Sequence, residues 1–272
     1  MSDHVEVVLH ENAEDLAQQT ARRLLAAVGE VLGSRPAPAP VHVVLTGGRV
    51  GGRTLQALGE LAGDAVAGEE GWDLSRLHLW FGDERYVPAG SDDRNDAQAR
   101  AALASSPALA PVCWHPMPSA DDGGDAVDAA ARYAAELAEH AEDLGAPDVE
   151  GDGRQLPGVP AFDVLMLGVG PDGHVASLFP DRQTLSQQGV SVVVEEDAPK
   201  PPALRLSLGV DAIRSAAEVW LVVAGEDKAQ GVARGLDPDE DVVRTPAVAA
   251  RGRRVTRWLV DRAAASQLSG NA

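Results

Sequence analysis

The sequence of 272 residues predicts an α/β protein in which one mostly parallel sheet lies between two layers of helices. Short apolar segments that suit buried strands alternate along the chain with longer segments of helical periodicity. The length suffices for one large α/β domain, and 44% of the residues are apolar, as in an ordinary globular core. Because no internal repeat or clear linker divides the chain, we expect a single Rossmann-like, three-layer αβα domain over residues 1–265. A flexible tail is expected over residues 266–272.

The first half of the chain alternates strands and helices in a regular order. A short strand is expected at residues 5–9. The helix at residues 12–32 has apolar side chains at helical spacing and Asn12 as its capping residue. The other elements follow from the same patterns: a stiff proline-rich connector at 36–40, a strand at 41–45, a helix at 52–67, a strand at 77–81 and a helix at 94–103.

The second half continues this alternation. Its most informative segment is residues 162–180, which predicts a buried strand, a glycine-rich turn, the polar residues Asp172, His174 and Ser177, and then the start of a helix. The remaining elements are a turn at 121–124, a helix at 126–144, a loop at 145–160, strands at 190–195, 204–208 and 219–224, a helix opening at 225–233, an acidic turn at 237–241 and a last strand at 255–260.

Composition and charge exclude several classes of protein. The net formal charge of −19 argues against nucleic acid or an anionic membrane as a partner, because both attract basic surfaces. Cys113 is the only cysteine, which excludes an internal disulfide and a cysteine-based metal cluster and fits a reduced, cytoplasmic location. The start of the chain lacks the features of a signal peptide, and no apolar run reaches the roughly 20 residues that span a bilayer.

Glycine and charged residues follow four of the expected strands. They occupy residues 46–49, 83–85, 170–174 and 225–228. Because the carboxyl ends of parallel strands share one edge of a sheet, these distant segments are expected to converge there, where ligands bind in open α/β folds.

Two of these segments suit an anionic ligand. Thr46-Gly47-Gly48 precedes a helix, whose free N–H groups and positive end can hold a phosphate, although tight turns use the same glycines. The spacing matches neither a Walker loop nor a dinucleotide fingerprint. Arg85 can grip a phosphate or carboxylate with its planar fork, or instead form a salt bridge with Asp83 or Glu84.

The third segment suits proton transfer. His174 lies between glycines at a strand end and is interpreted as a general base, since histidine exchanges protons near neutral pH. Ser177 is not surrounded by the Gly-x-Ser-x-Gly pattern of a serine nucleophile, so a capping or structural role is favoured for it.

Together these segments resemble the 6-phosphogluconolactonase family. The resemblance covers most of the chain, and its most specific part is the form Asp-Gly-His-x-Ala-Ser-Leu-Phe-Pro at residues 172–180. The family shares its fold with glucosamine-6-phosphate deaminases, whose corresponding motif ends in Phe-Asn-Glu-Pro. The Asp-Glu-Arg form at residues 83–85 is also typical of the lactonases. The chain departs from the family pattern at Arg49, where a serine or threonine is usual. Arg49 either supplies a charge there or points to solvent.

The resemblance implies hydrolysis of 6-phospho-D-glucono-1,5-lactone to 6-phosphogluconate without a metal or organic cofactor. It implies that His174 takes a proton from water and that Asp172 orients the loop or the imidazole. Oxyanion donors are expected from the backbone around Gly47 or from Arg85. Phosphate contacts are expected from the loop formed by Thr46, Gly47, Gly48 and Arg49, and from Arg205 and Lys228.

Lysine occurs only at positions 200 and 228, and Lys228 falls in a family motif, whereas Lys200 between prolines is interpreted as a loop residue. The expected partner is a small phosphorylated lactone, bound by a monomer or a homodimer. A deaminase or isomerase on the same fold and a non-catalytic sugar-phosphate-binding protein remain as alternatives.

Overall fold

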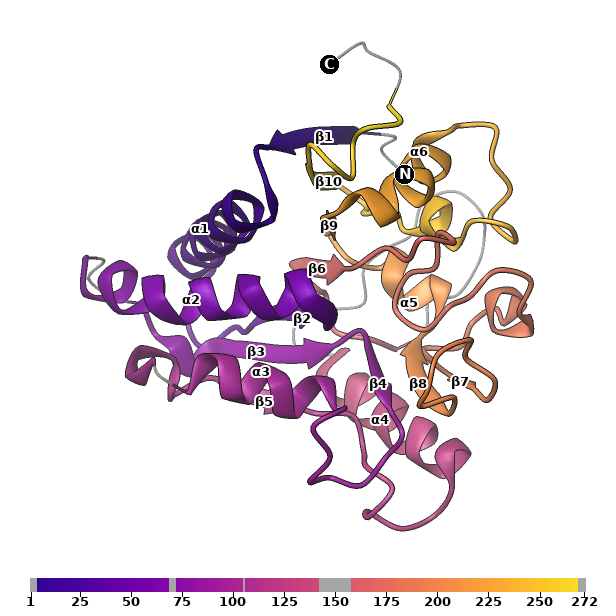
Figure 1. Cartoon of the computed structure of the whole chain (residues 1–272). Helices are drawn as coiled ribbons and strands as arrows, with labels where there is room; N and C mark the ends of the chain where they lie inside the picture. The colour runs from indigo at the N-terminus through magenta and orange to yellow at the C-terminus, as the bar shows by residue number, and fades with distance from the viewer. Residues whose placement is uncertain (1–3, 69–71, 105, 142–157, 269–272) are drawn as a thin grey trace.

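The structure, a computed structural model, describes residues 4–68, 72–104, 106–141 and 158–268 (Figure 1). Within these ranges a seven-stranded parallel sheet has the order β1-β10-β9-β6-β2-β3-β5. This confirms the predicted architecture. The strands are β1 (Val5–His10), β2 (Val41–Leu45), β3 (Leu77–Phe81), β5 (Cys113–His115), β6 (Val164–Leu167), β9 (Glu218–Val223) and β10 (Val255–Asp261).

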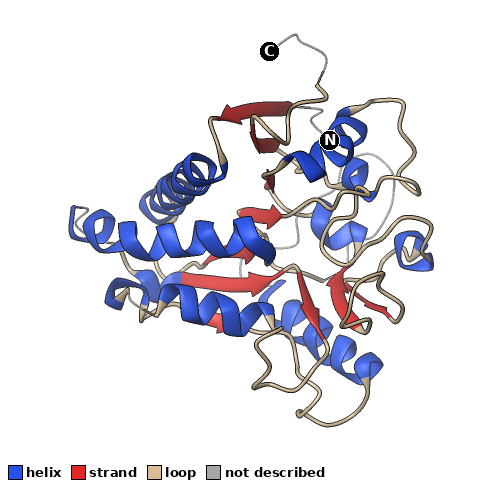
Figure 2. Ribbon diagram, viewed as in Figure 1, coloured by secondary structure: helices blue, strands red, loops and turns tan. Residues whose placement is uncertain are grey.

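Helices cover both faces of this sheet (Figure 2). Side chains alternate across a strand, so Val43 and Leu79 face one way and pack with leucines of the neighbouring helices α1 and α2. Trp80 faces the other way, toward Tyr133 of α4, whose hydroxyl accepts a hydrogen bond from the backbone N–H of Phe81. The helices are α1 (Ala13–Ser34), α2 (Gly48–Gly68), α3 (Asn95–Leu103), α4 (Ala126–Ala141), α5 (Val210–Arg214) and α6 (Ala229–Leu236).

Helix α1 begins at the capping residue that the sequence predicts. The side chain of Asn12 accepts hydrogen bonds from the N–H groups of Glu14 and Asp15, at 3.0 Å each, and so caps the helix. No helix within the described ranges is long and apolar enough to cross a membrane.

A second, smaller sheet lies beside the main one. It has the order β4-β8-β7, is antiparallel, and consists of β4 (Asp83–Arg85), β8 (Arg205–Leu208) and β7 (Val192–Glu195). The sequence predicts strands at 190–195 and 204–208 but does not separate them from the parallel sheet. Their separation is important for the site because β4 directly follows β3, so the second sheet borders the carboxyl edge of the first.

The connections of the sheet reverse direction between β2 and β6. The chain continues from β2 to β3 and β5 on one side, and from β6 to β9 and β10 on the other. Such a reversal leaves a crevice at the carboxyl ends of the two strands, which is the usual ligand position in open α/β sheets. The hydroxyl Oγ1 of Thr46, after β2, accepts a hydrogen bond from the N–H of Gly168, after β6, at 2.9 Å. This bond joins the two sides of the crevice.

Three expectations about the elements need correction. Helix α2 begins at Gly48 instead of residue 52, which places its first turn directly on the glycine pair. The helix expected after His174 does not form, because Val175 makes isolated bridges to Val169 and Leu178 and the segment continues as turns. Strands β4 and β5 and the short helix α5 were not predicted. Most of the loop expected at residues 145–160 and the end of the expected tail lie outside the described residues.

Candidate active site

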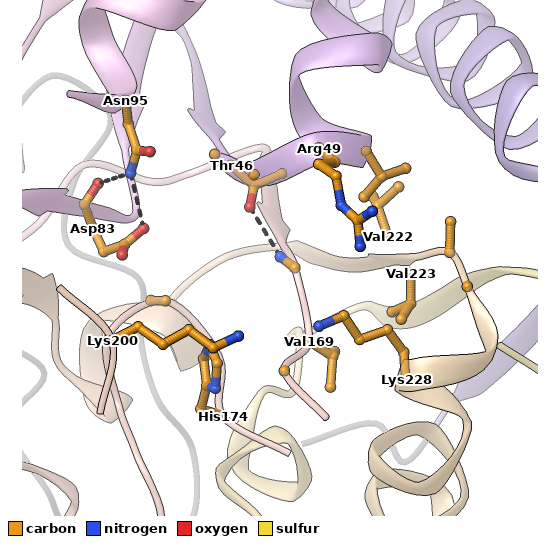
Figure 3. A pocket seen from close by; sticks show the side chains of 18 of the residues that line it. Thr46, Arg49, Asp83, Asn95, Val169, His174, Lys200, Val222, Val223 and Lys228 are labelled. Carbon is orange, nitrogen blue, oxygen red and sulfur yellow. Dashed lines mark hydrogen bonds between the residues drawn. The ribbon is translucent and has the colours of Figure 1, made fainter. Parts of the chain in front are cut away.

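Residues from all four predicted strand ends line one cavity of about 570 Å³ at the carboxyl edge of the sheet. Every site residue predicted from the sequence lines this cavity except Asp172, which lies behind His174. Figure 3 shows Thr46 and Arg49 on one side of this pocket, His174 on another, and the side chains of Lys200 and Lys228 pointing toward one another across it.

His174 is held by Asp172 in the turn after β6. Its Nδ1 lies 2.6 Å from Oδ1 of Asp172, and its ring lies against Phe179, with ring centroids 4.5 Å apart. Burial raises the pKa of Asp172, but the hydrogen bond and charge of His174 outweigh this and hold that pKa below its ordinary value. A carboxylate on Nδ1 fixes a proton there and leaves the lone pair on Nε2, as a general base requires.

Gly170 makes this pairing possible. A Cβ atom at this position would lie 2.0 Å from Nδ1 of His174 and 2.4 Å from Oδ1 of Asp172, so no larger residue fits without displacing the pair. The turn is closed by the N–H of Gly170, which donates to the carbonyl of His174 at 2.9 Å, and by Gly173, whose φ of +85° favours glycine.

The glycine loop after β2 presents the first turn of α2 to the cavity. Gly48 begins the helix with φ of +80°, and Gly47 approaches Asn95 so closely that a Cβ atom would lie 2.1 Å from Oδ1 of Asn95. The free N–H groups of this turn and the positive end of a long helix can hold an anion. The side chain of Arg49 is 90% exposed and lies 4.0 Å from Asp227, so it points toward solvent at the rim.

Strand β4 places Arg85 at the cavity, and the neighbouring Glu84 fixes this strand to the start of α3. The buried Glu84 carboxylate accepts hydrogen bonds from the N–H groups of Arg85, Asn95 and Asp96, at 2.8, 2.8 and 3.0 Å. Burial raises the pKa of Glu84 to about 7, and the N–H donors and Arg94 act in the opposite direction. The guanidinium of Arg85 donates a hydrogen bond to the carbonyl of Asp93, instead of forming the ion pair with Asp83 or Glu84 that the sequence left open. The Nε atom of Arg85 has no hydrogen-bond partner among the described residues.

Both lysines of the chain line the cavity. Lys228, at the start of the helical segment after β9, is 19% exposed and lies 3.3 Å from Asp227. The sequence reasoning treated Lys200 as a loop residue and missed its position in the pocket. That position is set by Arg205, which donates to the carbonyls of Lys200 and Pro202 at 2.9 and 3.0 Å. Only the scarcity of lysine in the sequence hinted at Lys200.

The cavity is more positive than the rest of the protein. Six basic side chains and three acidic ones line it, although the chain as a whole has a net charge of −19. The six are Arg49, Arg53, Arg85, Lys200, Arg205 and Lys228. Since exposed charges more than about 8 Å away are largely screened at physiological salt, the local cations determine which ligands enter.

Known proteins with similar sequences and structures are phosphosugar enzymes, which agrees with a cavity lined by cations. Residues 11–258 match the family described as glucosamine-6-phosphate isomerases/6-phosphogluconolactonase. The chain belongs to this family. A 6-phosphogluconolactonase of Streptomyces coelicolor is 45% identical over 98% of this chain and 96% of its own length. A solved 6-phosphogluconolactonase from Trypanosoma cruzi is 25% identical with a TM-score of 0.74, over 99% of this chain and 98% of that one.

Other activities in the family share this architecture. A solved monomeric glucosamine-6-phosphate deaminase covers 96% of this chain and 99% of its own with a TM-score of 0.71 at 18% identity, which shows the fold alone. Membership therefore leaves the reaction to be argued from the residues of the pocket.

Proposed function

We propose that this protein hydrolyses 6-phospho-D-glucono-1,5-lactone to 6-phosphogluconate in the pentose phosphate pathway. The observation that carries the proposal is the His174–Asp172 pair beside a pocket that contains both lysines of the chain. A general base and an anion site on one cavity suit a phosphorylated ester. The names of the full-length relatives agree with this reading, as does the Ser-Leu-Phe-Pro sequence that follows His174.

The first step is attack by water on the lactone carbonyl. Nε2 of His174 takes one proton from the water as its oxygen forms a bond to the carbonyl carbon, and the carbonyl oxygen becomes an oxyanion. Asp172 stabilises the imidazolium that results. The Arg85 side chain and the backbone N–H of Gly47, both of which line the cavity, are the donors that we assign to the oxyanion.

The second step opens the ring. The tetrahedral intermediate collapses, the bond between the carbonyl carbon and the ring oxygen breaks, and the imidazolium of His174 returns its proton to that oxygen. The first turn of α2, Lys200 and Lys228 hold the phosphate, and Arg205 contributes its charge and the position of Lys200. The protein gains and loses no atoms, and we assign no metal or organic cofactor to the reaction.

We place this activity in the cytoplasm, in a monomer or homodimer that acts on a small phosphorylated lactone. The single cysteine and the strongly acidic composition suit that location and argue against a nucleic-acid or membrane partner.

The test is hydrolysis of freshly prepared lactone, followed by pH-stat with the spontaneous rate subtracted. We expect turnover by the native protein and a loss of about 10²- to 10⁴-fold in His174→Ala, with an unchanged circular dichroism spectrum. Release of ammonia from glucosamine 6-phosphate without lactone hydrolysis would instead assign the deaminase reaction. Tight binding of 6-phosphogluconate with no turnover of either substrate would assign a binding protein.

A further inference from the structure

Four of the seven histidines of the chain lie together on the face of the sheet that α4 covers. His42 and His78 are register partners at the second positions of β2 and β3, while His115 ends β5 and His140 lies in the last turn of α4. For every pair except His42 with His115, the ring centroids lie 4.8 to 6.1 Å apart. None of the four lines the catalytic cavity.

Glu136 orients the central histidine of this group. Its Oε1 lies 2.7 Å from Nδ1 of His115, and Nε2 of His115 lies 2.9 Å from Nδ1 of His78. With the proton of His115 on Nδ1, facing the carboxylate, Nε2 carries a lone pair directed at His78. A carboxylate bound to the remote nitrogen of a histidine is the arrangement that accompanies metal-binding histidines.

Trp80 fixes the plane of the same ring. Its indole is stacked on His115 with centroids 3.8 Å apart and an interplanar angle of 8°, and its Nε1 donates to Nδ1 of the buried His42 at 3.1 Å. His115 is therefore held by a carboxylate at one edge and an aromatic face at one side, which leaves its Nε2 edge for a ligand.

We propose that His78, His115 and His140 bind a divalent first-row transition-metal ion, with zinc as the probe ion. One nitrogen from each of these three histidines lies within 4.8 Å of the others. Zinc–nitrogen bonds of about 2.0–2.1 Å in a tetrahedron place ligand nitrogens about 3.3 Å apart, so the side chains need move only by an ångström or so. Three histidines and one water complete such a site. The negative charge of the protein favours a bound cation.

The contact of 2.9 Å between His78 and His115 could also be an ordinary hydrogen bond between two histidines, which would involve only these two residues. It does not require a third nitrogen from His140, which comes from a different element, nor a carboxylate on the far side of His115. The metal site uses all of these features. Its three histidines do not line the cavity of the proposed reaction, and the proposal does not depend on that reaction.

Calorimetric titration of the chelator-treated, full-length protein with zinc chloride at pH 7.5 tests the site. We expect one ion per chain, with a dissociation constant in the micromolar range or below. His78→Gln and His140→Gln should each weaken binding by at least tenfold, and Glu136→Gln by about 10- to 100-fold. Cobalt(II) should give intense visible absorption between about 500 and 650 nm, as expected of tetrahedral coordination.

Two control variants separate this site from other histidines. His4→Gln, at an exposed position, and His174→Gln, in the catalytic pocket, should bind zinc as the native protein does. Zinc should raise the melting temperature of the native protein but not that of His140→Gln, and EDTA should leave lactone hydrolysis unchanged. The proposal is overturned if zinc binding is not saturable, or if Glu136→Gln and His78→Gln, both folded by circular dichroism, bind zinc with native affinity.

Discussion

The hydroxyl of Ser177 donates a hydrogen bond to Oδ2 of Asp83 at 2.7 Å, across a separation of 94 residues. Ser177 is fully buried, and the N–H of the same residue donates to the hydroxyl of Ser207 at 3.2 Å. Ser177 thereby joins the turn that contains His174 to β4 and β8. Within the part of the chain that the structure describes, Ser177 makes no hydrogen bond with His174, so the geometry does not provide a serine nucleophile.

Replacing Ser177 with alanine tests this structural role. The free energy of unfolding should fall by about 1–3 kcal/mol, because an oxygen of Asp83 loses its buried donor. The turnover number should fall by less than about tenfold, since in the proposed mechanism water and not the serine attacks the lactone. Urea denaturation and initial rates measure the two effects. A loss of activity as large as that of His174→Ala would make Ser177 a participant in the chemistry.

Gly170→Ala should abolish most activity through a steric effect on the catalytic pair. The added methyl group would lie 2.0 Å from Nδ1 of His174 and 2.4 Å from Oδ1 of Asp172, so both side chains must shift from these positions. We expect kcat to fall by at least about 10²-fold, a loss comparable with that of a catalytic group.

Gly52→Ala is the matched control for this substitution. Gly52 lies within α2, and a Cβ atom there meets nothing within 4 Å, so alanine should leave the rate unchanged and stabilise the helix by about 0.5–1 kcal/mol. Equal rates in the two variants would mean that the His174–Asp172 contact is not needed for catalysis.

Features that neighbouring residues determine could be predicted from the sequence, whereas features that depend on contacts between distant segments could not. Val41–Leu45 was predicted to the residue because a short run rich in valine, between a proline-rich connector and Thr46-Gly47-Gly48, is typical of a buried strand. The position of His174 in a turn at a strand end could be predicted because the glycines that fit it into that turn are its neighbours in sequence. The three-residue strands β4 and β5 were missed because they carry no periodic pattern and form only beside partners from distant segments.

The same limit explains the residues that the sequence did not reveal. Lys200 reaches the pocket because Arg205 binds its carbonyl, a contact that loop composition does not encode. The cluster of histidines depends on the register of β2 with β3 and on the placement of α4 over them. The expected helix after His174 failed because Ala176 adopts φ of +50° and the apolar residues around it pack into the core.

Lys228→Ala and Lys200→Ala should chiefly raise the Michaelis constant of the phosphorylated lactone. Each removes a cation that points into the pocket, and we expect increases of about tenfold or more from hydrogen bonds to a charged group. Arg49→Ala is the control, because this side chain is 90% exposed at the rim and should change the constant by less than about threefold. Calorimetry with 6-phosphogluconate measures the same contacts without turnover. Unchanged affinity in both lysine variants would remove them from the phosphate site.

Asp172→Asn separates the electrostatic role of this carboxylate from its role in packing. The asparagine keeps the size of the side chain but not its charge, and we expect kcat to fall by about 10²- to 10⁴-fold, since the imidazole loses the group that selects its tautomer and stabilises its cation.

The effect of the same substitution on stability should depend on pH. The pKa of Asp172 is lower in the folded protein than its ordinary value, because the interactions with His174 outweigh the effect of burial. Folding therefore favours the ionised carboxylate, and its contribution is present above the unfolded pKa of about 3.9 and is lost as pH falls through the folded pKa. The difference in free energy of unfolding between native and Asp172→Asn proteins should be larger at pH 5 than at pH 3, and should shrink as pH falls below about 4. Urea denaturation at successive pH values measures it, and a difference that stays the same from pH 5 to pH 3 would show that the charge of Asp172 does not stabilise the turn.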